Sequence, residues 1–400
     1  MPKKLVIVCL LNFFIAALLG LALRYAIIYP IGFNYRFLTH AHSHVAMLGW
    51  VYLMLYVLIV KYVVPEKKPV FNRLFWLTEF AVIGMLFSFP FQGYAAVSIS
   101  FSTLHIFCSY YFVYLIWKYH KTDSKVTAYM LKASLVFMLV STVGVWCLGP
   151  AVKMAGQASA FYQTAIQFFL HFQFNGWFLI AVIGVLFHLL KIPDSKQFLL
   201  FFKFLIASTV LTFALPVSWF APHVSLLWIN GFGLVLQFVS LYYFIEIVKQ
   251  PFRHFVTTEA KITRFMFRFA LWFYVIKIGL QAISLVPEVA NSLYEHRNFI
   301  IGFIHLTMLG TVSGFLFAFI FQSSVVKNHG TMAFGAYTFV LGFILTELIL
   351  LIQGCLFYFN HGLFPNYHLL LFFSSILLPL GIGSIIYSIL KTFNHVTETN

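Results

Sequence analysis

Charged residues are scarce in this sequence, and acidic residues are the scarcest. Charged side chains make up 9% of the 400 residues, only 10 residues are Asp or Glu, and 62% are hydrophobic. A soluble globular domain carries about one quarter charged residues, so the composition indicates that lipid surrounds most of the chain. No stretch rich in Pro, Ser or charge is long enough to be a linker, so we expect a single transmembrane domain over residues 1–400.

The motifs of soluble enzyme chemistry are also missing. No Gly-rich phosphate loop and no Ser-His-Asp signature is present. The four cysteines are scattered among apolar runs without a CxxC pair, so neither a disulfide framework nor a thiolate metal site is indicated. We expect these cysteines to be small core residues: Cys9, Cys108, Cys147 and Cys355.

Apolar runs long enough to cross a bilayer, which takes roughly 20 residues, recur along the whole chain. The first run follows two lysines as a signal peptide would, but it lacks a small-residue cleavage site, so we expect it to stay as the first helix. The sequence predicts an all-α polytopic membrane protein with spans at 5–28, 39–62, 74–94, 97–117, 126–149, 160–190, 198–219, 223–247, 264–286, 299–322, 333–358 and 366–390.

The net charge of +15 is distributed unevenly between the two ends of these spans. With the N-terminus inside, the outer segments contain few basic residues, namely Arg24, Arg36, Lys153 and Arg297. The inner segments contain Lys3, Lys4, Lys67, Lys68, Arg73, Lys118, Lys121, Lys125, Lys191, Lys196, Lys249, Arg253, Lys261, Arg264, Lys327 and Lys391. This positive-inside pattern predicts cytoplasmic termini in a bacterial inner membrane, and the basic excess requires no nucleic-acid partner.

One short pattern occurs three times, each time four predicted spans after the last. A glycine follows each histidine five positions later, in HVAMLGW from His44 to Gly49, HFQFNGW from His171 to Gly176, and HLTMLGT from His305 to Gly310. The sequence therefore predicts three pseudo-repeats of four helices, over roughly 1–125, 126–260 and 261–400. The histidines fall on the second, sixth and tenth spans.

These three spans all run from outside to inside, and each histidine lies in the outer part of its span. With a rise of about 1.5 Å per residue, His44 and His305 lie roughly 8 to 10 Å below their helix starts, and His171 somewhat deeper. We therefore expect the three imidazoles to approach a shared layer of the membrane near the outer leaflet.

The second span contains three histidines, His40, His42 and His44. His40 and His44 are four residues apart and share a helix face, whereas His42 points the other way. Imidazoles at lipid depth are costly without partners, and neutral imidazole is a ligand of haem iron, copper and zinc. We expect haem or metal ligation by these histidines with His171 and His305, and the alternative is hydrogen-bonded or water-facing rings.

Several further residues allow two interpretations. His105 is the next candidate metal ligand, whereas His223 and His368 are expected to face interfacial water. The three glycines would let either a flat macrocycle or a neighbouring helix approach closely. Lys277 and Glu347 would form a buried ion pair or belong to a proton path. The outer arginines, Arg24, Arg36 and Arg297, would bind haem propionates or extend to the membrane interface.

Two segments resemble known haem proteins of membranes. The run HAHSHVAMLGW at 40–50 resembles the His-x-His…Leu-Gly-Trp run of C-type heme-copper oxidases. It also resembles the H-x-H-E-M-x-x-G signature of the twelve-helix NnrS family, with Val45 in place of the Glu and the Met displaced to Met47. The run HLTMLGTVSG at 305–314 is similar to the H-x-L-T-x-G stretch of that family.

The resemblance implies three arcs of four helices with ligands on the second, sixth and tenth. A histidine of the second helix and His305 would then bind a six-coordinate haem, and His171 would lie near a second metal, copper. The sixth helix lacks the family's His-x-x-x-Tyr element, the seventh lacks a histidine pair, and the tenth has one histidine instead of two. The resemblance therefore implies a diverged oxidoreductase without the full copper-haem centre.

Three functions are compatible with this sequence. The first is a haem protein that transfers electrons, with a membrane or periplasmic partner, or that binds a small gas such as nitric oxide or oxygen. The second is a secondary transporter, although such folds show twofold repeats rather than threefold ones. The third is an assembly or structural subunit without a cofactor.

Overall fold

The computed structural model describes residues 2–66, 68–323 and 329–397. Lys67 and Lys327 of the predicted inner basic set lie outside these residues. Every regular element in the described ranges is a helix, which confirms the predicted all-α class. Within them, 12 helices are long and apolar enough to cross a membrane, so the chain is a polytopic integral membrane protein.

The spans follow the predicted order. They are α1 (Lys3–Ile28), α2–η1–α3 (Tyr35–Val63), α4 (Pro69–Gln92), α5 (Ala96–Tyr119), α6 (Lys125–Ala155), α7–η2–α8 (Ala160–Leu189), α9–α10 (Lys196–Ser218), α11 (Val224–Thr258), α12–η3 (Lys261–Leu285), α14–η4–α15 (Arg297–Gln322), α16 (His329–Tyr358) and α17 (Tyr367–Thr397). A short helix that the sequence did not indicate, α13 (Pro287–Glu295), precedes α14.

Several observed helix ends differ from the predicted ones, and prolines mark three of them. α4 begins at Pro69, several residues early, because the first position of a helix needs no backbone N–H. α6 and α11 continue through Pro150 and Pro251, beyond the predicted ends at 149 and 247. Proline is tolerated inside membrane helices because neighbouring groups satisfy the freed backbone atoms.

The chain divides into two compact units, which cut across the predicted repeats. Unit 1 comprises Met1–His120, Ala260–Phe269 and Ser313–Asn400, and unit 2 comprises Lys121–Glu259 and Ala270–Val312. The first two predicted repeats nearly match the beginning of unit 1 and the first segment of unit 2. The third is shared, because the spans α12–η3 and α14–η4–α15 each contribute to both units.

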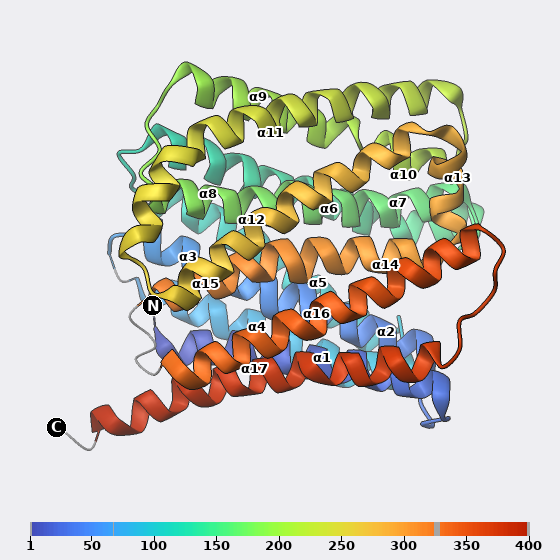
Figure 1. Ribbon diagram of the computed structural model, residues 1–400, viewed down its shortest axis with the longest axis horizontal. Coiled ribbons are helices and arrows are strands. Elements are labelled where there is room, and N and C mark those ends of the chain that lie inside the picture. Colours follow the sequence, from blue (N-terminus) through green and yellow to red (C-terminus); the bar gives the residue numbers. More distant parts are fainter. Residues whose placement is uncertain (1, 67, 324–328, 398–400) are drawn as a thin grey trace. The chain divides into compact units, whose positions relative to one another are not determined.

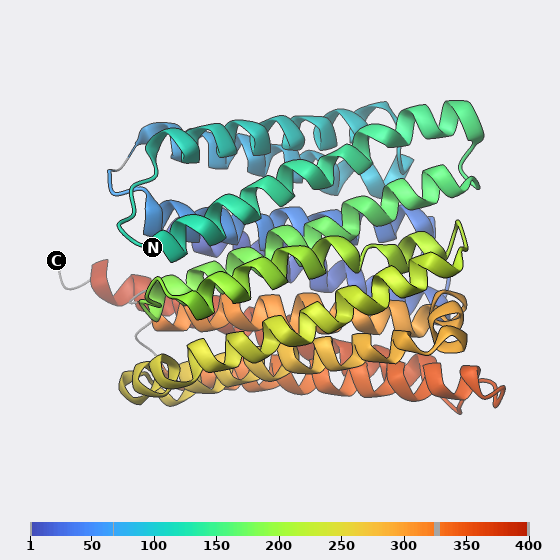
Figure 2. The same cartoon turned by 90° about the horizontal axis from the view of Figure 1, so that it is seen from above.

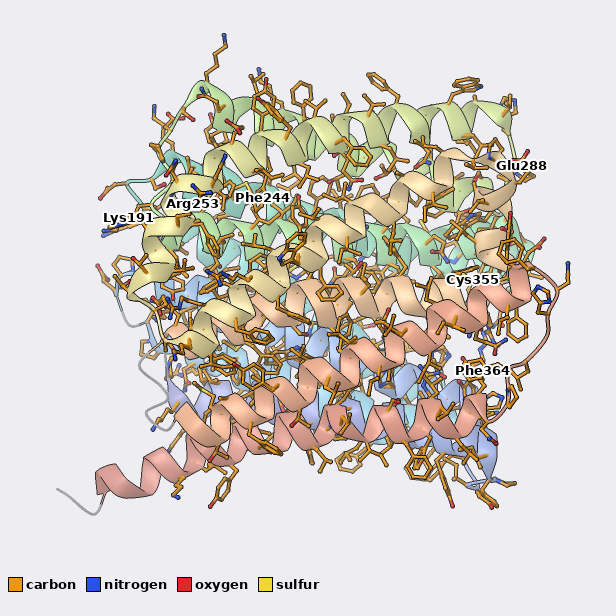
Figure 3. The ribbon with its side chains drawn as sticks, in the orientation of Figure 1. Lys191, Phe244, Arg253, Glu288, Cys355 and Phe364 are labelled. Carbon is orange, nitrogen blue, oxygen red and sulfur yellow. The ribbon has the colours of Figure 1, made fainter. Side chains whose placement is uncertain are left out.

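Each unit is held together by antiparallel neighbours. In unit 1, α16 packs along α17, α1 packs against α17 and α2, and α4 packs against α5 (Figure 1). In unit 2, α9 packs along α11 and α6 packs against α7, as both ribbon views show (Figures 1 and 2). Lys191 and Arg253 lie at one end of unit 2 and Glu288 lies at the opposite end (Figure 3).

The three spans with the repeated histidine share a feature that the sequence did not reveal. Each changes from α-helix to π-helix directly after its histidine, at η1 (Val45–Tyr52), η2 (Phe172–Phe178) and η4 (Leu306–Ser313). The most apolar windows of these spans are 78%, 83% and 78% buried, against 33–50% for the other nine. π-helical turns occur frequently at functional sites, so the repeated pattern has a structural counterpart.

Two of the repeated glycines permit close helix packing. A Cβ atom at Gly49 would lie 2.9 Å from Val82 Cγ1 of α4 and 3.0 Å from Asn12 Cβ of α1. At Gly176 it would lie 2.6 Å from Phe137 Cγ of α6. For both glycines, a neighbouring helix occupies the space that we had also considered for a macrocycle.

We expect Gly49→Ala and Gly176→Ala to lower the stability of the protein, by about 1–3 kcal/mol each, because the added methyl group has no room. The measurement is thermal unfolding in detergent. Gly279→Ala on α12 is the matched control, since a Cβ there meets nothing within 4 Å. Alanine favours a helix over glycine, so the control should be neutral or stabilising, and equal losses in all three variants would contradict the packing role.

Candidate functional site

The predicted ligands are divided between the two units. His40, His42, His44 and His105 belong to unit 1, whereas His171 and His305 belong to unit 2. Counted from the observed helix starts, His44, His171 and His305 lie roughly 12 to 17 Å along their own spans. His44 lies farther from its helix start than we expected, because α2 already begins at Tyr35, with Asn34 as its N-cap.

His42 faces α1 and is held there by the backbone. Its Nδ1 lies 2.8 Å from the carbonyl oxygen of Ala16. Since a carbonyl only accepts, Nδ1 carries the proton and Nε2 keeps its lone pair. The ring fits against Gly20, where a Cβ atom would lie 3.0 Å from Cε1 of His42. A histidine ligand of a metal commonly has this arrangement, in which the other ring nitrogen donates to a carbonyl.

His40 and His44 lie on the opposite face of α2, as the helical spacing predicts. The Nδ1 of His44 donates to the carbonyl of His40 at 2.8 Å, so its Nε2 accepts a hydrogen bond from the hydroxyl of Tyr94 at 3.2 Å. The ring centroid of His44 lies 4.4 Å from that of Phe89, and that of His40 lies 4.6 Å from that of Tyr94. Both ring nitrogens of His44 are therefore engaged within the protein.

His105 on α5 is a buried imidazole next to this pair. It is 3% exposed, and its ring centroid lies 4.7 Å from that of Tyr52 in η1. Its Nδ1 lies 3.5 Å from the hydroxyl of Ser109, while its Nε2 is buried without a hydrogen-bond partner among the described residues. His105 also lies within electrostatic range of His44. Across the part of the chain that the structure describes, this Nε2 is the one histidine ring nitrogen that is fully buried without a hydrogen-bond partner.

His171 is held in unit 2 by a break in the neighbouring span. Its Nε2 donates to the carbonyl of Thr209 at 2.8 Å. That carbonyl is accessible because α9 (Lys196–Leu211) ends there, and the amide of Phe213 bonds to Val210 instead, at 3.3 Å. The ring is 9% exposed and lies 5.5 Å from that of Phe213. The protonated Nε2 leaves Nδ1 as the nitrogen with a lone pair.

His305 ends α14 (Arg297–His305), immediately before the π-helical segment η4. It is half-buried. It therefore occupies the same position relative to its π-helix as His44 and His171 occupy relative to theirs.

Two asparagines that we did not single out make polar contacts inside the two units. Asn12 of α1 donates to the carbonyl of Gly49 at 3.1 Å and to Oε2 of Glu79 at 2.7 Å. Asn175 in η2 donates to the carbonyl of His171 at 3.2 Å. The sequence contains a signal for Asn175, because it stands where the other two copies of the pattern have Leu. Asn12 is likewise an isolated amide in the first apolar run.

Lys277 and Glu347 each have a partner inside their own unit. Lys277 is fully buried, and its Nζ donates to Oδ1 of Asn175 at 2.7 Å and lies 6.0 Å from the ring centroid of Phe303. Glu347 lies within electrostatic range of Arg24. The contacts of Lys277 are thus with an amide and an aromatic ring, where we had expected a carboxylate.

The outer arginines differ in their surroundings. Arg36 and Arg297 are exposed, whereas Arg24 on α1 is half-buried and lies within electrostatic range of His42 and His368. Arg24 therefore lies near His42, and Arg36 lies within electrostatic range of another candidate ligand, His40.

No group of three or more His, Cys, Asp or Glu side chains among residues 2–66, 68–323 and 329–397 is placed to hold a metal ion. Haem iron takes only one or two axial ligands from the protein, so a haem does not require such a group.

No protein-family model matches the chain, and no curated protein matches it. The resemblance to heme-copper oxidases and to the NnrS family rests on the histidine motifs alone and stays a prediction.

Replacing Asn175 by Leu removes the acceptor of a buried ammonium group. We expect Asn175→Leu to destabilise the protein by about 1–3 kcal/mol, because a buried polar group loses its hydrogen bond. The variant with both Asn175→Leu and Lys277→Met should regain most of that loss, since neither partner remains. Thermal unfolding of both single variants and the double variant tests this, and strictly additive losses would contradict a direct contact.

Proposed function

We propose that this protein is a haem-binding integral membrane protein that transfers electrons or binds a small gas such as nitric oxide or oxygen. The observation that carries the proposal is the arrangement of His42. Its Nδ1 is fixed on the carbonyl of Ala16 at 2.8 Å, which leaves Nε2 as a neutral donor for iron.

The surroundings of His42 support this role. Gly20 leaves room for the imidazole on α1, and Arg24 on the same helix lies within electrostatic range of the ring. A guanidinium group forms charge-assisted hydrogen bonds with carboxylates, so Arg24 is suited to a haem propionate. His44 fits less well, because the Tyr94 hydroxyl already occupies its Nε2.

The residues of the chain would orient and tune such a group. The Ala16 carbonyl fixes the ring tautomer of His42 and raises its basicity. The apolar helices around it exclude water, and this lowers the local dielectric on which a redox potential depends. A bound haem supplies the change of oxidation state or the open iron position.

The resemblance to heme-copper oxidases implies a second axial ligand, for which we propose His305; His42 and His305 belong to different units. If two imidazoles occupy both axial positions, the iron cannot bind a gas, and electron transfer is favoured. If His42 is the only axial ligand, the other position can bind a gas, and a gas-binding or reductase role is favoured. Copper remains the second candidate cofactor, with His171 as its proposed ligand.

We also propose a bacterial inner membrane location with cytoplasmic termini, based on the positive-inside pattern. The proposed partner is a membrane or periplasmic electron-transfer protein.

Single substitutions of His42, His44, His171 and His305 to Ala test the ligand assignment. We expect His42→Ala and His305→Ala to lose most of the bound haem and the Soret band, because each removes a bond to iron. The measurement is the ratio of haem to protein and the absorption spectrum after purification. His223→Ala, at the exposed N-cap of α11, is the control. Full haem content in all four variants would refute the assignment.

Gly20→Ala tests the position of the His42 ring without removing it. The new methyl carbon would lie 3.0 Å from Cε1 of His42, so the imidazole must shift. Changes next to a metal ligand typically cost about 10–100-fold in affinity, and we expect a loss of haem affinity in this range with a shifted Soret band. Gly149→Ala, where a Cβ meets nothing within 4 Å, should bind haem as the unaltered protein does. An unchanged spectrum in Gly20→Ala would argue against His42 as the ligand.

A further inference from the structure

The first turns of α12 (Lys261–Gln281) carry a group of cations on one face. Lys261, Arg264 and Arg268 are spaced by three and four residues, so their side chains lie above one another along the helix. With Phe265 they line a surface cavity of about 350 Å³. All four residues belong to the segment of α12 in unit 1. We name this cavity the α12 basic pocket.

No described carboxylate neutralises the cations of the α12 basic pocket. None of the three forms an ion pair with a residue of the described ranges, where the salt bridges are Lys68–Glu66 and Lys125–Asp194. Lys261 and Arg268 are exposed, and Arg264 is half-buried. Placing an arginine inside a membrane span costs free energy unless water or an anion solvates its charge. A negatively charged ligand in the pocket would lower this cost.

The same face of α12 continues as an apolar stripe deeper into the span. Trp272 and Ile276 follow Arg268 at helical spacing and are 67% and 39% exposed. On a membrane-spanning helix such a stripe faces acyl chains. Arg268 lies roughly 10 Å from the start of the span, which is close to the boundary between headgroups and acyl chains. The occupant must therefore combine a negative charge with apolar chains.

Phe265 supplies the apolar part of the pocket lining. Its ring meets that of Tyr337 on α16 edge-on, with centroids 4.9 Å apart. Tyr337 is 49% exposed, and Tyr is enriched at membrane interfaces, where its ring sits at the level of the headgroups.

We propose that the α12 basic pocket binds an anionic phospholipid through its phosphate. The two guanidinium groups, with their fixed forks of donors, match phosphate oxygens in pairs, and Lys261 adds a third positive charge. Basic pockets between membrane helices on the cytoplasmic side are suited to anionic headgroups. With the orientation proposed above, this site lies in the cytoplasmic leaflet. Free inorganic phosphate lacks the chains that would cover the Trp272 stripe.

The test compares lipid binding of the full-length protein with that of two double variants. Arg264→Gln with Arg268→Gln removes two charges from the pocket. Lys249→Gln with Arg253→Gln removes two exposed charges from α11, where Arg253 is visible in Figure 3. Purified protein in neutral detergent is titrated with phosphatidylglycerol, phosphatidylcholine or inorganic phosphate. Bound lipid is counted by native mass spectrometry, and the melting temperature is followed in parallel.

We expect phosphatidylglycerol, but neither phosphatidylcholine nor inorganic phosphate, to remain bound and to raise the melting temperature. The pocket variant should bind it on the order of tenfold more weakly, whereas the α11 variant should bind as the unaltered protein does. Equal weakening in both variants, or equal protection by phosphatidylcholine, would overturn the proposal, and protection by inorganic phosphate would indicate a soluble anion instead. Arg268→Lys, which keeps the charge but loses the fork, should bind at an intermediate level even if the double variant fails to fold.

Discussion

Polar groups in a membrane-spanning helix must find their partners inside the protein, and this constraint determines how the histidines of this chain are held. His42 donates to Ala16, His44 to His40 and His171 to Thr209, each time through one ring nitrogen and a backbone carbonyl at 2.8 Å. The carbonyls come from a helix that passes nearby, from the preceding turn and from a broken helix end. In each case the bond fixes the tautomer. His42 and His171 keep the second nitrogen for further chemistry, whereas that of His44 accepts a hydrogen bond from Tyr94.

The π-helical segments connect the sequence pattern to this arrangement. They begin directly after His44, His171 and His305 and lie in the three most buried spans. Close packing at the π-helices brings buried amides to them: Asn12 meets the carbonyl of Gly49, and Asn175 joins η2 to Lys277. The repeated histidine therefore belongs to a repeated helix irregularity, and two of its three copies, η1 and η2, have an asparagine as polar partner.

Composition and periodicity were enough to predict the twelve spans and the opposite facing of His42 and His44, because both depend on local spacing and the length of apolar runs. The π-helices could not be predicted, since their sequences VAMLGWVY, FQFNGWF and LTMLGTVS are as apolar as ordinary helix. The hydrogen-bond partners of Lys277 and His171 could not be predicted from the sequence either. They depend on which helices are neighbours and on the end of α9 at Leu211, and residue spacing along the chain reveals neither of these.

The proposed function requires that an imidazole whose tautomer is fixed by the backbone binds a haem iron. The most direct measurement is the absorption spectrum of the purified protein, oxidised and reduced, after expression with ample haem. We expect a strong Soret band with side bands that change on reduction. A protein that folds, purifies at full stability and shows no such band would contradict it.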